Sequence, residues 1–157
     1  MIYRTWNDSA AAAANIIYGQ IRLKKRASLE QLRTDYDDFV EQQFHSPAGL
    51  DIAKGRWAVI GADALEWGMA NGFKINEDTL VKTLIRKQRD YGPENIRRFG
   101  RQGLMVRMHD KIARLENLAE KKTDPNNESI DDTVMDIAGY AAIGIMWESM
   151  QFLLPLE

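Results

Sequence analysis

The fold is decided by the stretch from Glu128 to Met150, which reads ESIDDTVMDIAGYAAIGIMWESM. Its apolar residues surround the helix axis on every side, which is typical of a buried helix. Its acids recur every four residues, at Glu128, Asp132 and Asp136, so they share one face of that helix. Because an unpaired carboxylate is too costly to bury, a cation must meet Asp136.

These acids have more than one explanation. The helix dipole stabilises acids in a first turn, and Ser129 with Asp132 fits a capping box. That accounts for Glu128 and Asp132 but not for Asp136, which lies about two turns into the helix. Either a magnesium site or a salt bridge to an arginine of the preceding helix would account for Asp136.

The whole composition is that of a soluble globular protein, with 157 residues, 45% of them hydrophobic and 28% charged. This length is typical of one domain with a real core. The absence of cysteine excludes disulfides, thiol catalysis and cysteine-ligated zinc. No apolar run approaches the length of a membrane span, and the N-terminus does not resemble a signal peptide. We therefore expect no membrane partner and a cytoplasmic location.

Helical periodicity dominates the chain, and alternating β-branched stretches are missing. Short connections between the helices favour an all-α, antiparallel helical bundle. A weak seam near residues 72–75 separates an N-terminal helical accessory region, 1–75, from a core, 76–157, within one compact domain. The predicted helices span about residues 7–26, 28–44, 50–70, 76–89, 94–120 and 128–150.

Charge is unevenly distributed along the chain, although its net value is only −2. Ten basic and three acidic residues lie between Lys82 and Arg114, whereas two basic and nine acidic residues follow from Leu115 onward. This asymmetry indicates either two helices that pair through charge or a phosphate site beside a metal site.

The helix predicted at 94–120 carries one group of candidate site residues. Arg107, Asp110 and Arg114 share a face of this helix. If it packs beside the acidic helix, Asp110 adds a carboxylate and the two arginines suit phosphate oxygens. Otherwise the face is solvated, and the Asp110–Arg114 pair contributes little.

A second group lies between Lys87 and Asn95, where one helix ends and the next begins. Lys87 would hold a phosphate, Tyr91 would stack on a base, and Asn95 would read a base edge. The alternative is a simple helix stop in which Tyr91 serves only for packing.

Three blocks of residues in this half of the chain suggest a family. They are Lys87 with Tyr91-Gly92, Asp110-Lys111 with Arg114-Leu115, and Glu128-Ser129 with Asp132-Thr133, Asp136 and Tyr140. In their order and spacing they resemble the nucleotide modification associated domain, a family frequent in phages. That family is similar to the MazG-like all-α nucleoside triphosphate pyrophosphatases. The resemblance implies a MazG-like core in the C-terminal half and says nothing about residues before about 76.

The resemblance implies a magnesium-dependent pyrophosphohydrolase, which would convert a nucleoside triphosphate, modified or not, to its monophosphate and pyrophosphate. Asp110 and Asp136 would be catalytic and would hold Mg²⁺ together with Glu128 and Asp132. The residues implied for binding the nucleotide are Lys87, Tyr91, Asn95, Arg107, Lys111 and Arg114.

One departure from the MazG-like pattern favours a different function. MazG-like proteins set an ExxE helix against an ExxD helix, and this chain has no ExxE in the helix predicted at 94–120. A non-catalytic nucleotide-binding protein, a sensor or a sponge, is therefore the alternative. A nucleic-acid partner is disfavoured, because the C-terminal third is acidic and no DNA-binding motif is present.

The resemblance also implies a homo-oligomer, a dimer or a tetramer. The chain has four tryptophans that would suit either an oligomer interface or a monomer core. They are Trp6, Trp57, Trp67 and Trp147.

Overall fold

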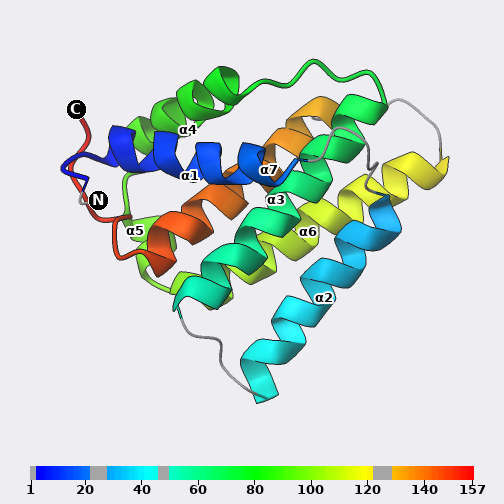
Figure 1. Cartoon of the computed structure of the whole chain (residues 1–157), viewed down its shortest axis with the longest axis horizontal. Helices are drawn as coiled ribbons and strands as arrows, with labels where there is room; N and C mark the ends of the chain where they lie inside the picture. The colour runs from blue at the N-terminus through cyan, green and yellow to red at the C-terminus, as the bar shows by residue number, and fades with distance from the viewer. Residues whose placement is uncertain (1–2, 22–27, 46–49, 122–128) are drawn as a thin grey trace.

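The computed structural model is an all-α helical bundle, which confirms the predicted fold class (Figure 1). It describes residues 3–21, 28–45, 50–121 and 129–157. Within these ranges the chain forms helices and no strand, and none of the helices is long and apolar enough to cross a membrane. The helices are α1 (Trp6–Gln20), α2 (Leu29–His45), α3 (Leu50–Ala70), α4 (Glu77–Tyr91), α5 (Glu94–Arg97), α6 (Gly100–Lys121) and α7 (Ile130–Glu148).

Helix α7 lies at the centre of the bundle and packs against α1, α3, α4 and α6. Its apolar residues are buried on all sides, as its sequence predicts: Val134, Ile137 and Ala141 are fully buried. This burial removes apolar surface from water along the whole helix, and such burial is the dominant favourable contribution in protein folding.

Small residues allow α3 and α7 to approach closely. A Cβ atom on Gly144 would lie 2.4 Å from the ring of the fully buried Trp57. A Cβ atom on Gly61 would lie 2.9 Å from the Cβ of Ala141. Because both contacts are shorter than van der Waals packing allows, glycine at these positions sets the distance between the two helices.

An ion pair anchors the C-terminal end of α7. Glu148 is only 3% exposed and accepts hydrogen bonds from Nε and Nη2 of Arg101, both at 2.5 Å. The indole Nε1 of Trp57 lies 3.4 Å from the same carboxylate. A bidentate guanidinium is the partner that a buried carboxylate requires, so this pair ties α6 to α7.

Side-chain caps lie at or next to the predicted first residue of several helices. Ser28 Oγ accepts from the N–H of residue 31 at 3.0 Å, Asn76 Oδ1 from that of residue 79 at 2.8 Å, and Ser129 Oγ from that of residue 132 at 3.0 Å. The first helix begins one residue earlier than predicted, at Trp6, because Thr5 caps it.

The helix predicted at 94–120 is two helices, α5 and α6. The chain breaks between them where Gly100 has a φ of 56°. A Cβ atom there would also lie 2.8 Å from the ring of Trp147. Glycine is therefore required at this position by both its backbone conformation and its close contact with α7.

The tryptophans belong largely to the monomer core. Trp6 and Trp57 are fully buried, and Trp67 and Trp147 are partly buried against the same core. An oligomer interface would need these rings on the surface, so the tryptophans do not supply one. The oligomeric state itself stays a prediction.

Candidate functional site

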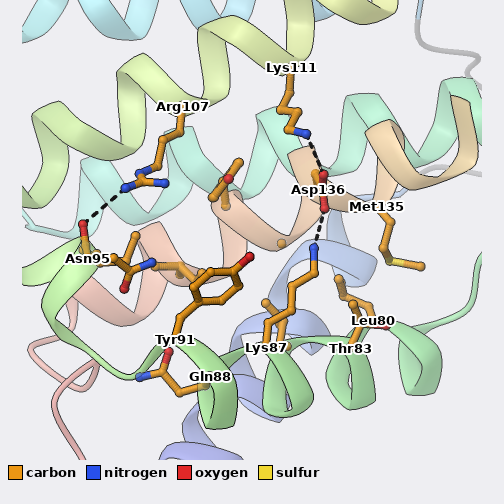
Figure 2. Close-up of a pocket in the computed structure, with 15 residues that line it drawn as sticks. Leu80, Thr83, Lys87, Gln88, Tyr91, Asn95, Arg107, Lys111, Met135 and Asp136 are labelled. Carbon is orange, nitrogen blue, oxygen red and sulfur yellow. Dashed lines mark hydrogen bonds and ion pairs between the residues drawn. The ribbon is translucent and has the colours of Figure 1, made fainter. Parts of the chain in front are cut away.

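A pocket of about 300 Å³ lies between α4, α5, α6 and α7 (Figure 2). It brings together most of the residues that the sequence predicts for nucleotide binding. Such a pocket is at the small end of the usual range for ligand sites. Its lining residues are Leu80, Thr83, Leu84, Lys87, Gln88, Tyr91, Asn95, Ile96, Arg107, Lys111, Met135, Asp136, Gly139, Tyr140 and Ile143.

The carboxylate of Asp136 is held between two lysines (Figure 2). Its Oδ1 lies 2.7 Å from Lys87 Nζ on α4, and its Oδ2 lies 2.9 Å from Lys111 Nζ on α6. The side chain of Asp136 is 12% exposed, whereas those of Lys87 and Lys111 are 48% and 22% exposed. The cation that Asp136 requires is therefore supplied by two ammonium groups.

The predicted alternative of an arginine partner for Asp136 is wrong. Arg114, the candidate on α6, donates instead to the hydroxyl of Thr133. Arg114 lies about one turn beyond Lys111 and about two turns beyond Arg107 along α6, and it meets the first turn of α7. The position of Arg114 along α6 therefore places its guanidinium beside Thr133 rather than Asp136.

Among the residues that the structure describes, the pocket lining is positively charged. It contains Lys87, Arg107 and Lys111 and one acid, Asp136, which gives these residues a formal charge of +2. Arg107 donates to the backbone oxygen of Asn95 at 3.4 Å and has no carboxylate partner in the described part of the chain. A concave site with excess positive charge attracts anions.

An aromatic ring and an amide form the other end of the pocket. Tyr91 is 68% exposed, and its ring lies between Asn95 and the Lys87–Asp136 pair in the view of Figure 2. The turn between the two side chains is fixed by Gly92, which has a φ of 66° and donates to the backbone oxygen of Gln88 at 2.9 Å. This turn places α5 so that Asn95 lines the same pocket as Tyr91.

Asp110 lies outside this pocket, on an exposed part of α6. Burial raises the pKa of Tyr36 on α2 to about 12, and Asp37 and Asp110 add to this rise. Asp110 is therefore close to α2, whereas the next residue, Lys111, faces α7. Successive residues on a helix point about 100° apart, which separates these two side chains.

Asp132 lies in a neighbouring cavity of about 410 Å³, whose lining also includes Asp131. Lys87 and Asp136 line both cavities, so their ion pair stands between them. Glu128, the remaining predicted metal ligand, lies outside the described residues.

The acids in the described ranges do not by themselves form a magnesium site. No group of three or more His, Asp or Glu side chains in these ranges is arranged to hold a metal ion. Both carboxylate oxygens of Asp136 are already bonded to lysine. Mg²⁺ binding therefore stays a prediction, and no step of the proposed function depends on it.

The lining includes three side chains with hydrogen-bonding groups that were not predicted as site residues from the sequence: Thr83, Gln88 and Tyr140. Thr83 lies four residues before Lys87 on α4, and Tyr140 lies four residues after Asp136 on α7. Residues four apart share a helix face, so Thr83 and Tyr140 could have been found by extending the predicted face by one turn.

The chain is an all-α protein with a basic, partly aromatic pocket at the meeting point of four helices. The family model described as nucleotide modification associated domain 1 matches residues 87–147. This range contains every lining residue of the pocket except Leu80, Thr83 and Leu84. No curated protein and no solved structure matches the chain.

Proposed function

We propose that this pocket binds a nucleotide, with a phosphate group at Lys87 and Lys111. The observation that carries the proposal is that these two lysines, from different helices, converge on one position beside α7. A phosphate group has enough oxygens to accept from both ammonium groups at once. The family match supports a nucleotide as the class of ligand.

The surrounding residues suit the rest of such a ligand. Arg107 adds a third cation to the pocket, and its charge is not neutralised by a carboxylate in the described ranges. The exposed ring of Tyr91 offers a face on which a nucleobase can stack. The nucleotide would therefore extend from the lysines toward Tyr91 and Asn95.

Non-catalytic binding is the form of this function that the described acids favour. A pyrophosphohydrolase of the predicted type needs clustered carboxylates, and the acids in the described ranges do not cluster around a metal position. The pyrophosphohydrolase, which is the function that the resemblance implies, then becomes the alternative. Pyrophosphate release from a panel of nucleoside triphosphates, measured with and without Mg²⁺, distinguishes the two, because a binding protein releases none.

The binding proposal is tested by calorimetric titration of a panel of nucleoside monophosphates. Lys87→Met and Lys111→Met should each weaken binding about 10- to 100-fold, since each removes a charge-assisted hydrogen bond to phosphate. Wild-type affinity should also fall as salt is added, because the contact is between charges.

Lys82→Met is the matched control for the two lysine variants. Lys82 is on α4 like Lys87, but it is 76% exposed and pairs with Asp78 at 2.9 Å. Its removal should leave nucleotide affinity unchanged. The proposal fails if no nucleotide binds, or if the Lys87 and Lys111 variants bind as tightly as Lys82→Met.

A further inference from the structure

A surface next to the pocket carries two exposed aromatic rings. Tyr91 is 68% exposed and Phe99 is 65% exposed. They flank α5, a helix of four residues that is only about 6 Å long. Helix α5 packs against α6, and it lies at one edge of the bundle in the view of Figure 1. The two rings therefore lie along one stretch of chain that starts at the pocket and ends where α6 begins.

Exposed arginines accompany the rings. Arg89 is in the last turn of α4, and Arg97 and Arg98 lie at the end of α5. Arg97 pairs with Glu94 at 3.3 Å, but both side chains are mostly exposed, so the pair contributes little. Arg89 and Arg98 have no carboxylate partner in the described ranges of the chain. The arginine–aromatic surface is defined here as Arg89, Tyr91, Arg97, Arg98 and Phe99.

The ring of Phe99 is held in place on this surface. The guanidinium carbon of Arg98 lies 5.4 Å from the centroid of the ring, which is a cation–π distance. A Cβ atom on Gly103 would lie 2.8 Å from the Cβ of Phe99, so glycine lets the Phe99 side chain lie close against α6. An exposed ring beside a guanidinium is an arrangement on which a nucleobase can stack while the cation meets its phosphate.

The charge argument against a nucleic-acid partner does not apply to this surface. It was based on the acidic C-terminal third, whose acids are partly neutralised elsewhere in the fold. Glu116 pairs with Arg33 at 2.6 Å, on the side of the bundle formed by α2. Glu148 is buried and paired with Arg101, and Asp136 is paired with two lysines. From residue 86 to residue 99, by contrast, the exposed side chains include five cations and two acids, an excess of +3.

We infer that the arginine–aromatic surface binds a single-stranded nucleic acid, one nucleotide of which occupies the pocket. This rests on the proposed nucleotide-binding function and names its ligand class, a nucleotide within a strand rather than a free one. One base stacks on Tyr91 and a following base on Phe99, while Arg97 and Arg98 bind the phosphates of the same strand. A duplex is not a ligand of this surface, because its bases are stacked on each other and cannot reach the rings.

The test is fluorescence polarisation with labelled, 5′-phosphorylated oligothymidylate and oligouridylate, each of about ten nucleotides. Wild type should bind at least one of these strands about tenfold or more tightly than the corresponding monophosphate, because a strand adds a second stacked base and further phosphates. Comparison of the two strands shows whether the sugar is deoxyribose or ribose. Phe99→Leu, which keeps an apolar side chain but loses the ring, should weaken strand binding about 5- to 50-fold. Phe99→Tyr, which keeps the ring, should bind like wild type.

The salt dependence of strand binding tests the arginines separately. Arg98→Gln should weaken binding and reduce the slope of log affinity against log salt by about 0.7, the value for one phosphate contact on a single strand. Lys121→Gln is the control, since it also removes one exposed positive charge. Lys121 is at the opposite end of α6, a helix of 22 residues, and thus about 30 Å from Arg98, beyond the range of screened charge interactions. This control should leave both affinity and slope unchanged.

Binding of free nucleotides separates a failure of this inference from a failure of the proposed function. Phe99 and Arg98 do not line the pocket, so their variants should bind nucleoside monophosphates like wild type, whereas Lys87→Met should not. If strands bind no more tightly than monophosphates, if Phe99→Leu binds strands like wild type, or if a duplex of the same length binds equally well, the inference is wrong although the pocket stands. If no monophosphate binds, the proposed function itself is wrong.

Sedimentation of the unliganded protein tests another occupant of the surface. Exposed rings also suit contacts between two copies of a chain. If wild type self-associates and Phe99→Leu is monomeric, the surface is an interface between copies, and the inference is overturned. Equal sedimentation of wild type and Phe99→Leu is the expected result.

Discussion

Replacing Asp136 with asparagine distinguishes two possible roles of this carboxylate: an anion that pairs with two lysines, and a ligand of Mg²⁺. In the unliganded protein it is the anion that Lys87 and Lys111 share, at 2.7 and 2.9 Å. Asparagine can accept from one lysine, but its NH₂ group then meets the other. Asp136→Asn therefore loses one charged interaction outright, weakens the second, and raises the formal charge of the pocket from +2 to +3.

The size of the effect follows from the exposure of the partners. The Lys87 contact contributes less free energy because solvent screens that side chain, which is 48% exposed. The side chains of Lys111 and Asp136 are only 22% and 12% exposed. A loss of about 1–3 kcal/mol in the free energy of unfolding is expected. For a domain of this length that is a fall of about 3–10 °C in melting temperature.

Anion binding should change in the opposite direction. Without the competing carboxylate, phosphate and nucleotides should bind Asp136→Asn about tenfold more tightly, which corresponds to about 1.4 kcal/mol. The assay is thermal unfolding at a series of phosphate and nucleotide concentrations, where tighter binding gives a larger rise in melting temperature. Asp78→Asn, which breaks only the exposed pair with Lys82, should change neither quantity noticeably.

Weaker binding in Asp136→Asn would refute this reasoning. If Asp136 were instead a metal ligand in a pyrophosphohydrolase, the variant would lose both Mg²⁺-dependent pyrophosphate release and nucleotide affinity. An unchanged melting temperature would likewise show that the lysine pairs do not stabilise the unliganded protein.

Two further predictions concern the core. Gly144→Ala should destabilise the protein by about 1–3 kcal/mol in urea unfolding, because its Cβ would overlap the Trp57 ring; Gly55→Ala, whose Cβ would meet nothing within 4 Å, should be neutral or stabilising. Burial raises the pKa of Tyr36 from 10.0 to about 12, so the folded protein keeps a proton that the unfolded chain releases first. Ionisation of Tyr36 should not affect the free energy of unfolding below pH 10 and should lower it as the pH rises from about 10 to about 12, so the fall over this range should be shallower in Tyr36→Phe; equal slopes would contradict this.

Local signals in the sequence predicted much of the fold. The apolar surround of α7 predicted its burial, and the predicted starts of three helices lie at or next to the residues that cap them, Ser28, Asn76 and Ser129, because both features depend on neighbours within one turn. The break before α6 was missed because its cause is distant: Gly100 must accommodate the ring of Trp147.

The site was predictable in its composition but not in its geometry. The sequence identified Lys87, Lys111 and Asp136, yet it did not pair them, since the rotation of α6 about its own axis depends on packing with α2 and α7. With α6 rotated by about 100°, Asp110 rather than Lys111 would face Asp136, and the site would be acidic. One residue step on a helix therefore decides between a cluster of carboxylates and a pocket lined by lysines.

The N-terminal helices position this pocket although the family match begins only at residue 87. Helix α4, which carries Lys87 and Tyr91, packs on α1, and Asn15 Nδ2 lies 3.5 Å from Glu77 Oε1 between the two helices. Helix α3 covers the side of α7 that carries Gly144. Because Lys87 and Lys111 reach Asp136 from separate helices, their convergence depends on how α1 holds α4 and how α3 holds α7. The matched segment thus supplies most of the pocket's side chains, whereas the distances between them depend on helices that lie outside it.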